Sequence, residues 1–219
     1  MGLEHDRVTV VADPLEATQT PGWQIVEGLP RKYWKALIEY SETDPEIAEF
    51  TSDPVRFKDE PSIEKWLEKG SAAYTITDPT GEQLLGLYWF RPEPIHLENP
   101  KKPEEKFTFL PGKEVDIADY PITNARRLYG PLRGARQSSA IFREVFGRFI
   151  QTEAFKQSNG GIWTETSGHN ERVIKVDIAN GFRQVTEVNG RGKIILVADK
   201  VDLLDRIPTA GIPSPRRGL

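Results

Sequence analysis

Four arginines lie close together in a chain whose net charge is negative. Arg126, Arg127, Arg133 and Arg136 fall within eleven residues, although 29 Lys and Arg stand against 33 Asp and Glu in the 219-residue sequence. The last two precede Ser138, where apolar side chains begin to recur at helical spacing. The first amides of a helix lack partners within it and attract anions, and guanidinium groups add charged hydrogen bonds to phosphate. These residue types and spacings predict a phosphate-binding site.

Two other interpretations of the same arginines stay open at this stage. A basic turn capped by Ser138 would simply face solvent. Alternatively, the arginine cluster would bind the phosphates of RNA, in which case affinity would fall steeply with salt. The net charge of −4 argues against a protein built around sequence-independent nucleic-acid binding, so we do not predict nucleic acid as a partner.

The elements that must position this cluster alternate between helical and strand patterns. The apolar periodicity predicts helices at 31–40, 61–70, 138–155 and 171–180, the last ended by Gly181. It predicts strands at 74–77, 84–90, 122–129, 161–166, 182–188 and 193–198, with a hairpin turn at 189–192. This order indicates an α+β fold with a mixed sheet that is antiparallel at first and parallel in the middle.

We expect one domain over residues 1–206 and a flexible tail over 207–219, which holds three prolines and a basic pair. Residues 91–120 contain five prolines and no clear periodicity. We interpret this stretch as an insertion with short strands near 107–110 and 115–117.

Several segments resemble the GCN5-related N-acetyltransferases. Residues 132–141, Leu-Arg-Gly-Ala-Arg-Gln-Ser-Ser-Ala-Ile, are similar to the loop with which that family binds pyrophosphate between a strand and a helix, although Arg136 stands where the family has glycine. Residues 161–170 and 180–183 resemble the strand, Asn, helix and Gly-Phe that follow. The phrases at 44–50 and 63–67 resemble the opening helices of the ribosomal-protein N-acetyltransferase branch. The resemblance covers residues 22 to 200.

The resemblance implies a three-layer fold in which two parallel strands in the middle of the sheet splay apart and helices flank both faces. Acyl-CoA would lie in the opening, with a backbone amide near Leu128 or Tyr129 polarising the thioester carbonyl. The implied contacts to acetyl-CoA, as a co-substrate, come from Leu128, Tyr129, Arg133, Gly134, Ala135, Arg136, Gln137, Ser138, Ser139 and Asn170.

The resemblance also implies a base for the attacking amine and an acid for the leaving thiolate. Glu165 is our first candidate for the base, and Glu114, Asp116 and Asp119 are weaker ones. Asp177 stands where many family members have the tyrosine that serves as acid. An unperturbed aspartate is ionised at neutral pH. Either burial raises the pKa of Asp177, or Tyr129 or water supplies the proton, or no acid is needed, and Asp177 could equally be an exposed residue without a catalytic part.

We therefore predict an enzyme, an N-acetyltransferase that transfers acetyl from acetyl-CoA to a primary amine by direct attack in a ternary complex. The amine would belong to a small molecule, a peptide or protein N-terminus, or a lysine. The alternative is a catalytically degenerate relative that binds acyl-CoA or a partner protein.

Composition restricts the remaining possibilities. The chain has no cysteine and three scattered histidines, so we expect neither disulfides nor a metal. It has no apolar run of membrane-spanning length and no signal-peptide pattern at its start, so we expect no membrane partner and a cytoplasmic location. We expect a monomer or a homodimer.

Overall fold

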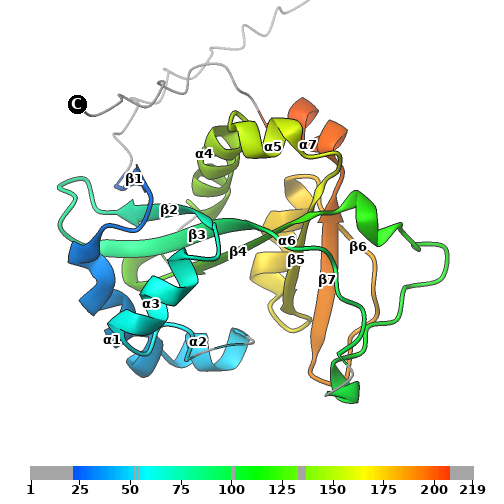
Figure 1. Cartoon of the computed structure of the whole chain (residues 1–219), viewed down its shortest axis with the longest axis horizontal. Coiled ribbons are helices and arrows are strands. Elements are labelled where there is room, and N and C mark those ends of the chain that lie inside the picture. Colours follow the sequence, from blue (N-terminus) through cyan, green and yellow to red (C-terminus); the bar gives the residue numbers. More distant parts are fainter. Residues whose placement is uncertain (1–21, 52, 54, 100–101, 133–136, 208–219) are drawn as a thin grey trace, which may run out of the picture.

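Seven strands of the described chain form one mixed sheet in the order β1-β2-β3-β4-β5-β7-β6. The structure is a computed structural model, and it describes residues 22–51, 53, 55–99, 102–132 and 137–207. The strands are β1 (Gln24–Glu27), β2 (Ala72–Thr77), β3 (Leu84–Pro92), β4 (Ile122–Leu128), β5 (Ile162–Ser167), β6 (Arg183–Gln184) and β7 (Lys193–Ala198). All neighbouring strands pair antiparallel except β4 and β5, which are parallel. The predicted α+β class with parallel strands in the middle is confirmed (Figure 1).

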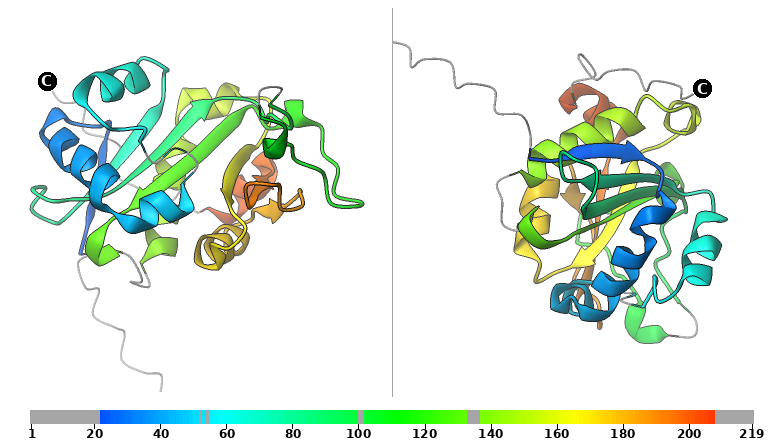
Figure 2. Two further views of the ribbon diagram at one scale, coloured as in Figure 1. Left: turned by 90° about the horizontal axis from the view of Figure 1, so that it is seen from below. Right: turned by 90° about the vertical axis from the view of Figure 1, so that its left-hand side faces the viewer.

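Helices cover both faces of the sheet (Figure 2). They are α1 (Trp34–Thr43), α2 (Pro45–Phe50), α3 (Glu60–Leu67), α4 (Ser138–Phe149), α5 (Glu153–Gln157), α6 (Glu171–Ala179) and α7 (Lys200–Arg206). One apolar core lies between the sheet and α1 to α3, where Leu37 and Ile63 meet Leu87 and Trp89. A second core lies on the opposite face, where α4 and α7 bury their apolar stripes. The result is the three-layer arrangement that the sequence predicts.

The predicted helix over 138–155 is two helices. α4 ends at Phe149, and the hydroxyl of Thr152 then accepts a hydrogen bond from the amide of Phe155 at the start of α5. A hydroxyl residue in extended conformation is a strong N-cap, so it begins a new helix rather than extending the old one. Because the apolar stripe continues across the break, periodicity alone does not reveal it.

The insertion after β3 contains short 3-10 helices at Pro103–Glu105 and Ile117–Asp119. Of the short strands expected near 107–110 and 115–117, the first is an isolated antiparallel bridge between Phe109 and Thr186, and the second is not formed. Its apolar side chains Ile95, Phe107 and Tyr120 pack on β5 and β7. The insertion also accounts for the shortness of β6. Leu110 N–H donates to Val185 O at 2.9 Å and Glu187 N–H donates to Thr108 O at 2.8 Å, so the insertion pairs with the chain that was predicted as strand 182–188.

The C-terminal part of the described chain adds α7, which the sequence analysis did not predict. Lys200 anchors this helix, because its ammonium group donates to three main-chain carbonyls at the end of α5, those of Phe155, Lys156 and Ser158. Ile207 is buried in the core with α4, although we expected it to open the tail. Residues 208–219 lie outside the described chain.

Candidate active site

The parallel strands β4 and β5 separate soon after they begin. They pair only at Ile122 with Ile162 and at Thr123 with Trp163. Beyond these pairs β4 stays in register with β3 as far as Leu128, and β5 stays in register with β7 as far as Ser167. The two facing edges therefore diverge, and a pocket opens between them. We call it the central pocket. This divergence matches the splayed strands that the sequence analysis expected.

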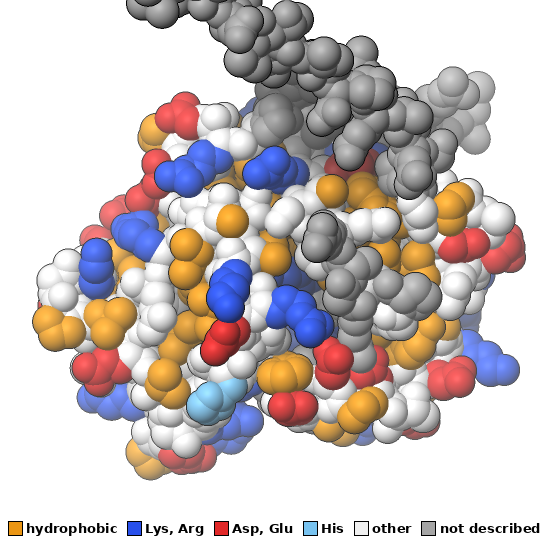
Figure 3. Space-filling model, turned by 180° about the vertical axis from the view of Figure 1, so that it is seen from behind, with side chains coloured by type: hydrophobic (Ala, Val, Ile, Leu, Met, Phe, Trp, Pro, Cys, Tyr) orange, Lys and Arg blue, Asp and Glu red, His pale blue; other side chains and the backbone are white. Residues whose placement is uncertain are grey.

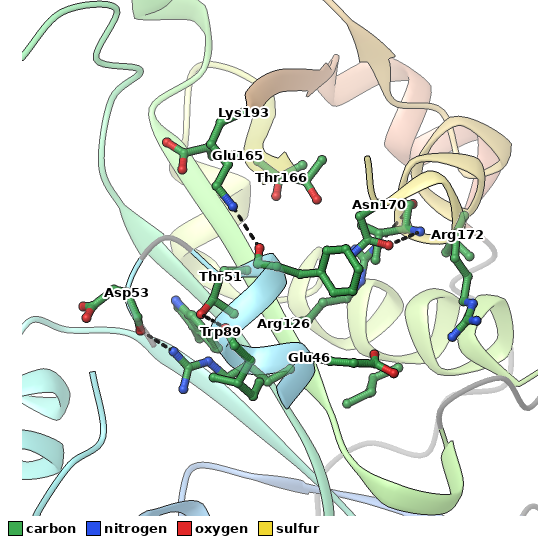
Figure 4. Close-up of a pocket in the computed structure, with 18 of the residues that line it drawn as sticks. Glu46, Thr51, Asp53, Trp89, Arg126, Glu165, Thr166, Asn170, Arg172 and Lys193 are labelled. Carbon is green, nitrogen blue, oxygen red and sulfur yellow. Dashed lines mark hydrogen bonds between the residues drawn. The ribbon is translucent and has the colours of Figure 1, made fainter. Parts of the chain in front are cut away.

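The central pocket has two halves, because side chains alternate between the faces of a strand. On β4, Arg126 and Leu128 point to the face covered by α4 and α6, whereas Ala125 and Arg127 point to the face covered by α1 to α3. Glu165 shares the second face, since Trp163 is in direct register with Thr123. We call the halves the α4–α6 side and the α1–α3 side. Figure 4 shows Asn170 and Arg172 on one side and Asp53, Trp89 and Glu165 on the other.

Helix α4 begins at Ser138, as predicted, and Ser138 lines the central pocket. The residue that precedes it, Gln137, makes no side-chain hydrogen bond to the first turn of the helix. The amide end of a twelve-residue helix therefore points toward the pocket without a side-chain cap from Gln137. Ser139 follows in the same turn. The remaining loop residues of the prediction, Arg133, Gly134, Ala135 and Arg136, lie outside the described residues.

Arg126 forms a buried ion pair with Asp177 of α6. Their side chains are 10% and 1% exposed, and Arg126 Nη1 lies 2.7 Å from Asp177 Oδ1. Burial raises the pKa of the Asp177 carboxyl, and the guanidinium of Arg126 opposes that rise. Burial disfavours the charge of Arg126, but Asp177 and Tyr88 together oppose this effect and the pKa of Arg126 rises. The guanidinium of Arg126 therefore keeps its proton at neutral pH. The second carboxyl oxygen of Asp177, Oδ2, is buried and has no hydrogen-bond partner within the described chain. The interpretation of Asp177 as an exposed residue is wrong.

Tyr129 lies away from the central pocket. Its ring is fully buried and stacks on Tyr40 of α1, with the ring centres 4.4 Å apart. Its main-chain N–H donates to Leu85 O at 2.8 Å. The structure therefore uses both the ring and the amide of Tyr129 to hold β4 against α1 and β3. Leu128, its neighbour, does line the pocket.

Glu165 and Lys193 lie together on the α1–α3 side (Figure 4). Glu165 is exposed on β5, and Lys193 of β7 donates from Nζ to the carbonyl of Phe50 at the end of α2, 3.0 Å away. Burial lowers the pKa of Lys193, and the nearby carboxylate of Glu165 opposes this change. The weaker base candidates Glu114, Asp116 and Asp119 belong to the insertion and do not line the pocket.

Asn170 has a structural task as well as a place in the central pocket. Its Oδ1 accepts a hydrogen bond from the amide of Val173 at 3.2 Å, so Asn170 is the N-cap of α6. It also lines the α4–α6 side together with Arg172.

The pocket residues that sequence reasoning missed include Arg56, Trp89, Arg172 and Lys193. Arg172 directly follows the N-cap of α6, so its position was a usable signal. Trp89 also belongs to the core under α1 to α3. Arg56 and Lys193 carry no sequence signal, because the sheet order and the chain after α2 bring them to the pocket.

The described residues contain no group of three or more His, Cys, Asp or Glu that could hold a metal ion. None of the helices in this part of the chain is long and apolar enough to cross a membrane.

No protein-family model matches the sequence, and no curated protein matches it. Solved structures do match. Aminoglycoside acetyltransferase AAC(6')-Ib in complex with coenzyme A and kanamycin has a TM-score of 0.55 at 12% identity, covering 83% of this chain and 98% of that one. Spermidine N-acetyltransferase from Vibrio cholerae in complex with CoA and spermine has a TM-score of 0.53 at 11% identity, covering 84% and 99%.

These likenesses define the class of fold, an α+β sheet with two diverging parallel strands. It is the fold of the GCN5-related N-acetyltransferases, as the sequence analysis expected. Neither of the two structures named above is a ribosomal-protein N-acetyltransferase, so the resemblance to that branch stays a prediction.

Proposed function

We propose that this chain is an N-acetyltransferase that takes its acetyl group from acetyl-CoA. The observation that carries the proposal is the divergence of β4 from β5, which opens a pocket at the N-terminus of α4. Diverging strand edges can hydrogen-bond an extended chain of amides laid between them. A helix N-terminus attracts the phosphates at the end of such a chain. Coenzyme A matches this arrangement, because its pantetheine is an extended chain with amides and its pyrophosphate lies at the end of that chain.

Acyl-CoA would bind on the α4–α6 side. Ser138, Ser139 and Asn170 line or adjoin this half, and Leu128 lies on the edge of β4. Arg133 to Arg136 and Gln137 connect β4 to α4 in the sequence, so we propose that they hold the pyrophosphate. Two solved structures of this fold are complexes with coenzyme A, which supports this assignment.

The amine would enter from the α1–α3 side, where Glu165 faces the central pocket. Glu165 takes the proton of the ammonium group, and the amine then attacks the thioester carbonyl carbon. A carbon–nitrogen bond forms, the carbon–sulfur bond breaks and a thiolate leaves, and the second proton that the nitrogen must lose passes to the thiolate or to water. The bound geometry supplies much of the rate, since both reactants are held in one gap.

Arg126 faces the same gap from the α4–α6 side, and we propose that its positive charge stabilises the leaving thiolate. Asp177 would be a positioning residue, since it touches Arg126 rather than the pocket. Because Asp177 does not line the central pocket, it has no direct path to the leaving thiolate, and we assign it no role as an acid. We assign Tyr129 no role in the reaction.

The test combines coenzyme A binding with acetyl transfer. We expect purified protein to release free thiol from acetyl-CoA in the presence of a suitable primary amine. We expect Arg133→Glu to weaken coenzyme A binding by about tenfold or more, the effect of losing one charged hydrogen bond. Arg31→Glu is the matched control, because Arg31 pairs with Glu60 on the exposed surface. Unchanged affinity in Arg133→Glu, measured by calorimetry, would overturn the assignment of the loop.

The alternative is a non-catalytic protein that binds acyl-CoA. The position of Asp177 favours it, because this side chain is buried against Arg126 and does not line the central pocket, so it offers no proton donor there. Saturable coenzyme A binding without transfer to any amine in a broad panel would support this alternative and exclude the enzyme.

The burial of Arg126 and Arg127 argues against the RNA-binding interpretation. Arg126 is buried against Asp177, and Arg127 is buried on the other face of the sheet, so the four arginines do not form one surface patch. Figure 3 shows basic side chains interspersed with acidic and apolar ones over the described part of the face behind Figure 1.

A further inference from the structure

Arg127 is a buried guanidinium without a carboxylate partner. The residue is 4% exposed and lines the α1–α3 side of the central pocket. Its Nη1 donates to Ser41 Oγ at 3.1 Å and its Nη2 to the carbonyl of Asp53 at 2.6 Å. Its Nε has no hydrogen-bond partner within the described chain. Both donated bonds go to neutral oxygens, which do not balance the charge. A buried charge without an ion-pair partner destabilises the folded protein. The presence of a buried arginine at position 127 therefore suggests a role other than stability.

A second guanidinium lies beside it. Arg56 donates from Nε to Asp53 Oδ2 at 3.2 Å, and its side chain is 24% exposed. It also lies over the ring of Trp89, 5.5 Å from the ring centre. The carboxylate of Asp53 is therefore already paired with Arg56. Burial lowers the pKa of Arg127 and the charge of Arg56 adds to this effect, whereas Tyr129 and the carboxylate of Asp53 oppose it.

The remaining carboxylates that line this side are Glu165 and Glu46. The carboxylate of Glu165 favours the charged form of Lys193, and the ammonium group of Lys193 also donates to the carbonyl of Phe50. Glu46 lines the pocket from α2, and no ion pair joins it to Arg127. Within the described residues, Arg127 forms no ion pair with any carboxylate, although two of its neighbours, Arg56 and Asp53, form one with each other.

Arg127 and Glu165 face the same half of the central pocket. Both belong to the inner strands β4 and β5, on the sheet face that Thr123 and Trp163 share. A small molecule in this half can therefore meet a carboxylate at one end and guanidinium groups at the other. The first suits an ammonium group. The second suits a planar anion, which a guanidinium binds through two parallel hydrogen bonds.

We propose that the acceptor is an amino acid, whose amine is acetylated near Glu165 and whose carboxylate is bound by Arg127 and Arg56. The inference rests on the proposed function and narrows its substrate class. It excludes polyamines as preferred acceptors, since these carry only positive charge and would leave Arg127 unpaired. A site built to pair with a group discriminates strongly against analogues that lack it.

The experiment compares amino acids with the amines formed by their decarboxylation: lysine with cadaverine, arginine with agmatine, tyrosine with tyramine, and tryptophan with tryptamine. Each pair differs in one carboxylate. We expect kcat/KM to favour at least one amino acid over its amine by about tenfold or more, as for a charged hydrogen bond. Arg127→Met, which keeps the length and apolar body of the side chain, should bring this ratio close to one.

Arg56→Gln is the second variant, since Arg56 is more exposed and its loss threatens folding less. It should reduce the same ratio. Arg172→Met is the matched control, because it removes a guanidinium from the α4–α6 side. It should affect an amino acid and its amine alike and leave the ratio in place. Circular dichroism establishes that each variant is folded.

Two outcomes overturn the inference: the decarboxylated amines are acetylated as well as or better than the amino acids, or the ratio survives both Arg127→Met and Arg56→Gln. If no compound is acetylated, the proposed function fails separately. Calorimetric titration of the same compounds in the presence of coenzyme A then tests whether Arg127 forms an anion site. Binding of an amino acid that is lost in Arg127→Met supports the anion site, and absence of binding by all four amino acids overturns it.

Discussion

Two adjacent arginines of β4 are stabilised in different ways. Arg126 is paired with the carboxylate of Asp177, whereas Arg127 donates to Ser41 Oγ and to the Asp53 carbonyl and forms no ion pair within the described residues. A buried guanidinium that has a carboxylate partner is electrostatically complete within the protein. One that lacks such a partner is ready to receive an anion. This contrast is why we assign Arg127 to recognition of an anionic group of the substrate.

Breaking the Arg126–Asp177 pair should destabilise the protein strongly. Asp177→Leu leaves a buried guanidinium uncompensated, and we expect it to reduce the free energy of unfolding by about 3–5 kcal/mol. The double variant Arg126→Met/Asp177→Leu should recover most of this loss, because it removes both charges. Urea unfolding measures the free energy of unfolding of both variants.

The control for this pair lies on the same helix. Glu171 pairs with Lys175 at 2.9 Å, with both side chains about three-quarters exposed (77% and 75%). Glu171→Gln should cost no more than about 1 kcal/mol, as for other exposed pairs. A double variant as unstable as Asp177→Leu alone would show that the loss comes from packing rather than from the uncompensated charge.

Some site residues could be predicted from the sequence and others could not. Ser138 and Asn170 each begin a helix, and local sequence determines where a helix begins. Both line the central pocket. Lys193 and Arg56 reach the pocket from β7 and from the chain after α2, far away in sequence. Only the strand order brings them there, and no local pattern encodes it.

At the scale of elements, the starting point of β5 determines where the central pocket opens. Gly161 N–H donates to Asp119 O at 2.7 Å, just before β4. This contact fixes the beginning of β5 against the chain that leads into β4. The parallel pairs Ile122 with Ile162 and Thr123 with Trp163 come directly after this contact, and beyond them β4 and β5 separate.

Gly160 allows that contact, and Gly160→Ala should disrupt it. A Cβ at this position would lie 1.9 Å from the carbonyl oxygen of Asp119, a main-chain atom that cannot rotate away. We expect the free energy of unfolding to fall by more than about 2 kcal/mol, as for severe overpacking. The matched control is Gly22→Ala, because nothing lies within 4 Å of a Cβ there. Equal stability of the two variants in urea unfolding would contradict this role of Gly160.

The sequence predicted long elements better than short ones. The strands β3 and β4 and the helices α4 and α6 carry enough periodic residues to be recognised, whereas β1 has four residues and was missed. The predicted strand at 182–188 is longer than β6 for a different reason. Residues after Gln184 have a strand-like pattern, but Thr108 and Leu110 of the insertion pair with them. Competition from a distant segment is invisible to local propensity.

At the scale of the whole molecule, the central pocket is open to two differently built sides of one sheet. The α4–α6 side presents a helix N-terminus, and the α1–α3 side presents charged side chains from α2, β5 and β7. Two ligands can therefore approach the same gap from different layers. Such an arrangement suits two substrates that must be present together, since neither has to leave before the other binds.

The kinetics should reflect this arrangement. We expect initial rates measured over a grid of acetyl-CoA and amine concentrations to give intersecting double-reciprocal lines, which indicate a ternary complex. The chain has no cysteine to carry an acetyl group as a thioester, and direct attack needs no covalent intermediate. Parallel lines would indicate a ping-pong mechanism through an acylated side chain, and they would contradict the assignment of the two sides to two substrates bound at the same time.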